Sequence, residues 1–430
     1  MTARFEKSGT PLRQWPWLLA LAVAIALPWV FYDWGHHRQS GFVISMLSQM
    51  GMMAIFALSY NMLMGGAGLL SFGHAIFFGL GGYSAIHILN GAKAGTFPIP
   101  VELVPLAAGF AGLGFAAVFG YMATRQRATA FAMITLGMGE LMTVAAMMFH
   151  NFFGGEGGVT TDRMIDFSLF GLSYASGLQV YYLIVAWTVL SIIGMAFLTG
   201  TPLGRMVNAC RDNHERAQFM GYDPKTVRFL QFALSGFFAG IGGGLFALTY
   251  EIVTFDAVAA PLSANALLMA YIGGSTVFAG PIVGAVLITL LQSGLSLLSN
   301  AWLVYVGVLF IAMVMFAPTG ITGIIQAHSP IARTGRMRRL AVPYLRLVIP
   351  GLAVIVGVVG MVELLSFLTI GAAQGKTLVL FGRTIDVNTT APWIVAAVCL
   401  FGGGVWLRVE GRAFHRVWET LTAELKVSAP

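Results

Sequence analysis

The feature that most constrains this chain is a succession of apolar runs, each long enough to cross a lipid bilayer. A bilayer core about 30 Å thick needs roughly twenty apolar residues in helical form. Hydrophobic residues make up 57% of the 430 residues and charged residues only 10%, which excludes an ordinary soluble domain. Unbroken runs favour helices over a β-barrel, whose strands alternate. We therefore expect an all-α integral membrane protein with about twelve candidate spans. These spans are residues 15–32, 41–64, 75–90, 101–124, 128–153, 178–199, 227–250, 263–278, 281–298, 302–316, 343–370 and 392–407.

The distribution of Lys and Arg predicts which side of the membrane each loop faces, because cytoplasmic loops are enriched in both. If both termini are cytoplasmic, the inside stretches hold 19 of the 24 Lys and Arg residues. The five outside are Arg38, Lys93, Arg163, Lys376 and Arg383. The net charge of +7 is then a topology signal and a source of lipid contacts, and does not indicate nucleic-acid binding.

The stretch GAAQGKT at residues 371–377 is one residue short of the phosphate-binding pattern G-x-x-x-x-G-K-[ST]. A long apolar run precedes it, and the residues TLVLFGRTIDV that follow alternate like a short hairpin instead of opening a helix. Lys376 also falls on the outer side, where no ATP is available. We interpret the stretch as a Gly-rich turn, and expect no ATP site, catalytic residue or metal site in this chain.

A Gly-rich sequence, NMLMGGAGLLSFGHAIFFGLGGYSAI at residues 61–86, runs from the second span into the third. Irregular backbone at membrane depth is tolerated only where protein or a water-filled cavity covers it, so a broken helix here indicates a translocation path. Asn61, Ser71 and His74 lie at the expected break and are candidate path residues. The alternative is that they hydrogen-bond freed backbone groups and hold helices together.

Glu140 is the acidic residue placed most deeply in a predicted span. A carboxylate in hydrocarbon costs several kcal/mol, so we expect Glu140 either to face the bundle interior with a partner or to be protonated, and we expect it to contribute to the path. Gly137 and Thr143 place small and polar groups on the same helix face. A purely structural hydrogen bond is the competing interpretation.

The longest polar stretch between core spans is TPLGRMVNACRDNHERAQFMGYDPKTVRF at residues 201–229. Thr201 followed by Pro202 predicts a helix start, Asp212 with Glu215 predicts a capping box, and Gly221 predicts a helix end. We expect two short cytoplasmic helices that leave a groove for a soluble partner. The groove residues would be Val207, Cys210, Phe219 and Met220.

The sequence resembles the LivM-type permeases of branched-chain amino acid ABC importers. The resemblance rests on GLLSFGHAIFFGLGGY, ITLGMGE, GGEGGVT, the segment 204–243 and YIGGSTVFAGPIVGAVL, and it covers about residues 41–325. It implies a core of about ten helices with discontinuous helices and an inverted repeat, whose only sequence echo is a pair of Gly-rich breaks, near Gly65 and near Gly273.

Further expectations about partners follow from the resemblance. It implies a second, LivH-type permease, two cytoplasmic ATPase subunits that bind ATP, a periplasmic substrate-binding protein, and a bacterial inner-membrane location. The ATPases would act through a coupling segment at 201–226, in which Glu215, Ala217 and Gly221 match an E-A-A-x-x-x-G pattern with Arg216 in place of the first alanine. The coupling residues implied are Arg205, Arg211, Asp212, Glu215, Ala217 and Gly221.

The resulting domain organisation has four parts. Residues 1–40 hold the N-terminal segment and first span, 41–325 the permease core, 326–346 a basic cytoplasmic linker, and 347–430 an extension with two further spans. The resemblance stops at about residue 325, so the extension carries no functional assignment beyond peripheral packing or partner contact.

Other functions remain as alternatives at this stage. The same permease type carries urea, short amides or small aromatic carboxylates, and no residue here decides among these substrates. A proton-coupled secondary transporter could use Glu140 and His74, but would not require the capped helix pair. An intramembrane serine protease is suggested only by GYSA at residues 82–85 with nearby histidines, a pattern that ordinary helix packing also produces.

Overall fold

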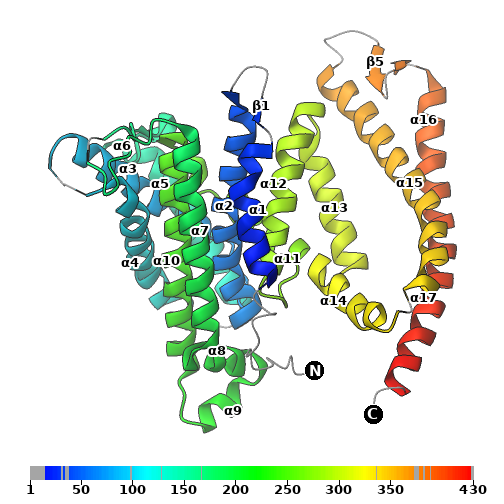
Figure 1. Cartoon of the computed structure of the whole chain (residues 1–430), viewed down its shortest axis with the longest axis horizontal. Coiled ribbons are helices and arrows are strands. Elements are labelled where there is room, and N and C mark those ends of the chain that lie inside the picture. The colour runs from blue at the N-terminus through cyan, green and yellow to red at the C-terminus, as the bar shows by residue number, and fades with distance from the viewer. Residues whose placement is uncertain are drawn as a thin grey trace. The chain divides into compact units, whose positions relative to one another are not determined.

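The computed structural model is almost entirely helical, as the sequence predicts, and it divides into two compact units, Met1–Leu290 and Leu291–Pro430. Figure 1 labels the elements. The structure describes residues 15–30, 32–33, 38–96, 99–126, 128–165, 167–335, 337–371, 377–380, 383–387 and 389–427.

Most of the predicted spans are helices long and apolar enough to cross a bilayer. Ten such helices lie in the described ranges, or eleven if α13 and α14, which meet at 41°, form one bent span. Two of the twelve predicted spans fall outside the ten. The first is the 16-residue α1, and the other is α13, which is long enough only together with α14.

The first unit holds the helices that form the core. They are α1 (Trp15–Val30), α2 (Gly41–Asn61), α3 (Ala75–Lys93), α4 (Val104–Ala123), α5 (Ala128–Met148), α6 (His150–Phe153), α7 (Gly177–Gly200), α8 (Pro202–Asp212), α9 (His214–Phe219), α10 (Pro224–Tyr250), α11 (Ala260–Gly273) and α12 (Gly280–Leu298), which runs into the second unit. Short strands pair as β1 (Tyr32–Asp33) with β2 (Arg38–Gln39) and β3 (Val159–Thr160) with β4 (Ile252–Val253).

Helix α10 is the centre of this unit and packs against α2, α3 and α4. Its sequence GFFAGIGGG removes side chains where backbones cross, which small residues permit in membrane helices. A Cβ added at Gly243 would lie 1.8 Å from the Phe78 carbonyl oxygen of α3, and one at Gly240 would lie 2.4 Å from the Ala108 oxygen of α4. Glycine is therefore required at both crossings.

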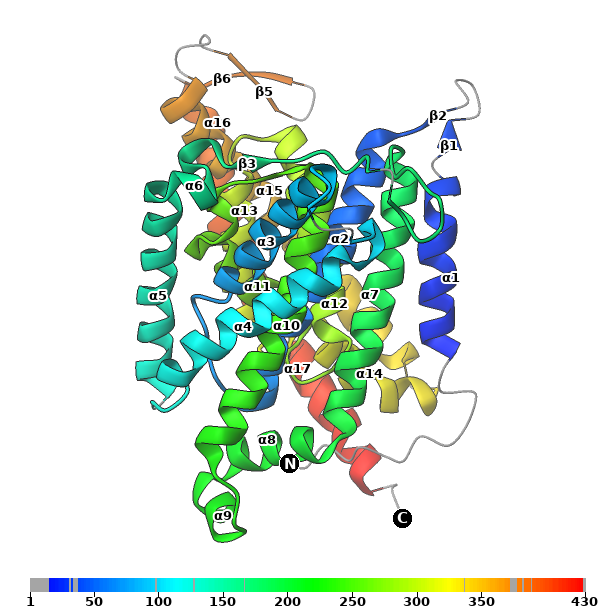
Figure 2. The same ribbon diagram turned by 90° about the vertical axis from the view of Figure 1, so that its left-hand side faces the viewer.

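Helices α8 and α9 lie at one end of the first unit, and α6 and β3 lie at the other end (Figure 2). The caps that the sequence predicts for α8 are confirmed, since Thr201 Oγ1 accepts a hydrogen bond from the Gly204 N–H, and Pro202 occupies the first helical position. Asp223 caps α10 by accepting from the Lys225 and Thr226 N–H groups. The chain thus turns twice at this end before α10 re-enters the core.

The second unit contains α13 (Trp302–Phe316), α14 (Gly320–Arg333), α15 (Arg338–Ser366), α16 (Thr390–Ala397) and α17 (Gly403–Val427). A π-helical turn, η8 (Val398–Gly402), joins α16 to α17 into one continuous helix. This helix packs against α15, where Gly357 lacks a side chain and so allows close contact with the Leu400 backbone. The predicted hairpin after residue 376 is confirmed by the antiparallel pair β5 (Thr377–Leu380) and β6 (Arg383–Asp386). Lys376 itself lies outside the described residues.

Described residues of the segment 326–346 belong mostly to α14 and α15. A small cluster of Ile331, Leu340 and Leu421 joins these two helices to α17. The boundaries of the C-terminal extension remain a prediction.

Candidate translocation path and coupling segment

The Gly-rich break predicted after the second span is present. Helix α2 passes directly into a π-helix, η2 (Met62–Ala67), which ends at Gly68 with a φ of +67°. A π-helix widens the turn, and such turns are frequent at functional sites. Residues 68–74 then form an irregular connection to α3.

The second predicted break, after α11, lies directly against the first. The Asn61 Nδ2 donates to the Ser275 carbonyl (3.3 Å), and a Cβ on Gly65 would come within 2.5 Å of the same oxygen. Helix α11 ends at Gly273, and Gly274 has a φ of +111°. The two Gly-rich interruptions found in the sequence therefore meet within the first unit.

His74 is fully buried at the end of the irregular connection. Ser59 Oγ donates to the Phe56 carbonyl (2.7 Å), so the 3.0 Å contact with His74 Nε2 requires the ring nitrogen to be the donor. Nδ1 is then an acceptor, and it has no hydrogen-bond partner among the described residues. The same holds for Asn61 Oδ1 and Ser71 Oγ, both buried. Three of the four predicted path residues thus flank one break and keep unused hydrogen-bonding capacity.

Glu140 does not face the bundle interior, so that expectation is wrong for this chain by itself. Its side chain lies on the exposed face of α5 with Gly137, and with Met133 and Leu141, which are 73% and 62% exposed. An inward-facing Glu140 is expected only if this one chain forms the whole helix bundle. Because a carboxylate near the middle of a span is costly in lipid, this face of α5 is where a second subunit or water is needed.

The N-cap of α9 is Asn213, one residue after the predicted Asp212, so the predicted capping box of Asp212 with Glu215 is wrong. Asp212 is the last residue of α8, and Asn213 caps α9 by accepting from the Arg216 N–H (2.9 Å). Gly221, with a φ of +86°, closes α9 as predicted, and the Tyr222 N–H bonds back to the Ala217 carbonyl.

The predicted groove in this segment does not form. Val207 and Cys210 are buried on the inner face of α8. Phe219 and Met220, at the end of α9, are 91% and 66% exposed. The segment therefore has an inner face, to which Ala217 also belongs, and a protruding apolar tip. Burial and the neighbouring Asp223 raise the pKa of the Cys210 thiol above its ordinary value.

Helix α8 contacts the broken helix directly through Arg211. The Nη1 atom of Arg211 donates to the Gly65 carbonyl of η2, and its Nε and Nη2 atoms lie 3.1 and 3.0 Å from Asp212 Oδ1. A second donor, Gln231 Nε2 of α10, binds the Met62 carbonyl (2.9 Å). Both side chains therefore donate hydrogen bonds to main-chain carbonyls of η2, and that of Gly65 lies in its last turn, where carbonyls lack partners within the helix. Glu215 is exposed, as is Arg205.

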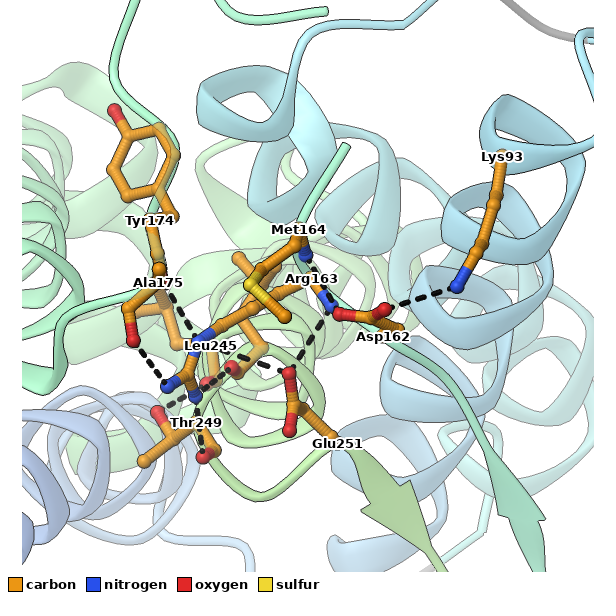
Figure 3. A network of polar contacts seen from close by, with 10 residues as sticks. Lys93, Asp162, Arg163, Met164, Tyr174, Ala175, Leu245, Thr249 and Glu251 are labelled. Atoms are coloured by element: carbon orange, nitrogen blue, oxygen red, sulfur yellow. Dashed lines mark hydrogen bonds and ion pairs between the residues drawn. The ribbon is translucent and has the colours of Figure 1, made fainter. Parts of the chain in front are cut away.

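A polar network that sequence reasoning missed holds the loop at the opposite end of the unit (Figure 3). Arg163 donates to the carbonyls of Leu248 (3.3 Å) and Thr249 (3.2 Å) at the end of α10 and to the Tyr174 carbonyl (2.9 Å). A cation at a helix C-terminus is favourable because the last carbonyls lack partners. Glu251 accepts from the Arg163 N–H (3.1 Å). The sequence identifies Arg163 only as one of the five Lys and Arg residues predicted on the outer side, and does not predict this role.

The outer network extends to α3 and to η3 (Val101–Leu103), the short helical turn that leads into α4. Asp162 accepts from Lys93 Nζ (2.9 Å), and this contact is the main cause that holds the Asp162 pKa below its ordinary value of 3.8. Glu102, only 5% exposed, accepts from the Leu169 N–H (3.1 Å) and the Tyr174 hydroxyl (3.0 Å). The described residues of the segment 158–176 are therefore held by side chains of α3 and η3 and by the end of α10.

The chain has many helices long enough to span a membrane, and they surround a helix that is broken within the core. The helix pair α8–α9 protrudes at one end of this unit. These features are typical of a multi-pass membrane transport protein. Comparison with known families narrows this class: residues 42–318 match the family described as branched-chain amino acid transport system, permease component. This chain belongs to that family.

Individual relatives agree with the family match. The chain is 25% identical over 334 residues to the high-affinity branched-chain amino acid transport system permease protein LivM of Escherichia coli, covering 73% of this chain and 76% of the relative. It is 31% identical over 172 residues to a probable branched-chain amino acid transport permease protein LivH of Methanocaldococcus jannaschii, covering 37% and 52%. A fructose import permease protein, FruF of Bifidobacterium longum, is 33% identical over 117 residues, 25% of this chain and 32% of the relative. No solved structure matches the chain significantly.

Proposed function

We propose that this chain is one of two permease subunits of an ATP-driven importer for branched-chain amino acids in the bacterial inner membrane. The observation that carries the proposal is the direct contact between the α8–α9 pair and the broken helix, through Arg211 and Gly65. A carrier driven only by a gradient has no use for a protruding helix pair joined to its core. The relatives, permeases named for branched-chain amino acid transport, support the substrate class.

In this proposal the α8–α9 end is cytoplasmic, with both chain termini on the same side. The apolar tip, Phe219 and Met220, enters a groove of an ATPase subunit, since exposed large apolar side chains on a short helix suit helix-in-groove docking. Polar contacts to the ATPase come from Glu215 on α9, beside this tip, and from Arg205 and Asp212 on α8. ATP is bound by two such partner subunits and not by this chain.

The exposed face of α5 faces the second permease across the path, so that Glu140 lies in a protein-lined, hydrated space instead of in lipid. Asn61, Ser71 and His74 lie at the paired breaks and offer hydrogen-bond acceptors to a passing polar group or to water. A periplasmic binding protein delivers the substrate at the opposite end, where the loop 158–176 is fastened.

Reconstitution in lipid vesicles tests the proposal. The chain is assembled with a LivH-type permease and ATPase subunits from the same source, and uptake of radiolabelled leucine is measured with a binding protein present. We expect uptake that requires ATP and persists when an ionophore collapses the proton gradient. Uptake that survives removal of the ATPases but stops with the ionophore would instead establish a proton-coupled carrier.

ATP-dependent uptake of urea, a short amide or an aromatic carboxylate, with leucine ignored, would keep the importer assignment and change the substrate. A matched vesicle sample with a catalytically inactive ATPase controls for passive leakage. Dependence on ATP or on the proton gradient identifies the driving force, and the choice of radiolabelled compound identifies the substrate.

A further inference from the structure

Arg211 is the residue through which the α8–α9 pair reaches the broken helix. It lies at the end of α8, and its guanidinium donates to the Gly65 carbonyl in η2. Its aliphatic part lies against Gly68, where an added Cβ would come 3.0 Å from Arg211 Cγ. Gly68 therefore provides the space for the arginine stem, and Gly65 provides the acceptor.

The guanidinium is held in place from the other side by its neighbour in sequence. Asp212 Oδ1 lies 3.1 Å from Nε and 3.0 Å from Nη2, and leaves Nη1 for the carbonyl of η2. Arginine presents its donors in a rigid planar fork, so fixing one edge on a carboxylate also fixes the direction of the opposite edge. Asp212 thus orients the contact between α8 and η2.

The acceptor lies near the end of η2, where helix carbonyls lack partners of their own. The last four carbonyls of a helix have no partner within it, and Gly65 lies in the last turn of η2. Val207 of α8, 2% exposed, also packs here, because a Cβ on Gly66 would come 3.7 Å from its Cγ1. One face of α8 therefore rests on the three glycines of the break.

The two side chains that bind η2 come from different places. Gln231 belongs to α10, the centre of the core, whereas Arg211 belongs to the peripheral pair that protrudes from it. A displacement of α8 consequently changes the Gly65 contact and leaves the Met62 contact in place.

We propose that Arg211 is the positioning residue that transmits movement of the α8–α9 pair to the π-helical break at Gly65–Gly68. This inference rests on the proposed function, in which ATPase closure moves α9. When α8 shifts, Arg211 and Asp212 move together and carry the Gly65 carbonyl with them, so the final turn of α2–η2 changes its geometry.

The experiment compares Arg211→Gln with Gln231→Leu in the reconstituted importer, and records leucine uptake and ATP hydrolysis on the same vesicles. Arg211→Gln should lower leucine transported per ATP about three- to thirty-fold, the range in which single contacts change coupling between sites. Gln231→Leu removes the other η2 contact but not the link to α8. Gln231→Leu should lower leucine uptake and ATP hydrolysis by the same factor, because it reduces only the amount of folded protein.

Two further variants separate charge from contact. Arg211→Lys keeps a donor without the planar fork and should recover part of the ratio. Arg125→Gln removes a cation from the same end of the unit, where Arg125 lies over the Tyr121 ring (3.9 Å), and should leave the ratio unchanged. A parallel loss of uptake and hydrolysis in Arg211→Gln, like that of Gln231→Leu, would overturn the proposal.

Hydrogen exchange on the purified chain provides a test that needs no ATPase. Arg211→Gln should speed exchange of the amides at 66–69 by about tenfold, because a charge-assisted bond to their turn is lost. Unchanged exchange there overturns the inference even if the importer works. Wild-type vesicles without ATP-driven uptake would refute the proposed function, and exchange would then still decide whether Arg211 holds the break.

Discussion

Replacing Gly243 by alanine tests whether the core depends on direct backbone contact between α3 and α10. The added methyl group would lie 1.8 Å from the Phe78 carbonyl oxygen and 2.9 Å from the Gly82 nitrogen, and real Cβ contacts are not shorter than 3.0 Å. Both neighbours are backbone atoms and cannot rotate away. The two helices must therefore separate locally by about 1.2 Å, on the geometric reasoning that holds for overpacked cores.

The expected cost follows from two opposing effects. Overpacking costs about 1–3 kcal/mol, and a backbone obstacle places this site near the upper end. Alanine is a better helix former than glycine by about 1 kcal/mol, which offsets part of that cost. We expect Gly243→Ala to destabilise the folded protein by about 2 kcal/mol as the difference of these two terms.

The assay is thermal unfolding in detergent, followed by the loss of monodisperse protein on size exclusion. Gly114→Ala on α4 is the matched control, because nothing lies within 4 Å of its added Cβ and the position is exposed. The control should leave the midpoint unchanged or raise it. Equal midpoints for Gly243→Ala and Gly114→Ala would refute the packing argument.

Two more predictions concern charged residues. Glu140→Gln should reduce ATP-driven uptake several-fold, whereas Leu190→Ala, at an exposed position of α7, should have little effect; equal losses would remove the special status of the carboxylate. The lowered pKa of Asp162 means that its bonds to Lys93 and to the Met164 N–H stabilise the fold fully above the ordinary value of 3.8 and are lost as the pH falls through the lowered value. The protection factor of the Met164 amide, which is the intrinsic exchange rate at each pH divided by the observed rate, should therefore fall on acidification. In Asp162→Asn this factor should already be low at neutral pH and should not fall further in acid.

The parts of the fold that sequence predicts well depend on local signals. Apolar length gives the spans, and Thr201 with Pro202 gives the start of α8 because capping needs only neighbouring residues. The cap of α9 is missed by one residue. Asp212 and Asn213 both have capping side chains, and the choice depends on backbone conformation: only Asn213 has the extended φ of −154°.

Glu140 and Arg211 show why the candidate site is less predictable. The cost of a carboxylate in lipid predicts that Glu140 contacts protein or water, but this cost does not distinguish the interior of one chain from a surface shared with another. Arg211 contacts a carbonyl 146 residues away, and a main-chain acceptor leaves no residue-type signal in the sequence. Before the fold is known, Arg163 appears only among the five cations predicted outside. Arg211 is named only as a coupling residue implied by the family resemblance, and its acceptor in η2 is not predicted.

The central position of α10 also affects how the protein is made. Helices α3 and α4 leave the ribosome first, and their glycine-lined faces have no partner until α10 is complete. Since α4 ends at Ala123 and α10 at Tyr250, about 130 residues of synthesis intervene, or roughly 6–25 s at bacterial and eukaryotic elongation rates. During that interval α3 and α4 lie in the membrane without their main packing partner, which is complete only when α10, the sixth of the ten long spans that the structure describes, has been made.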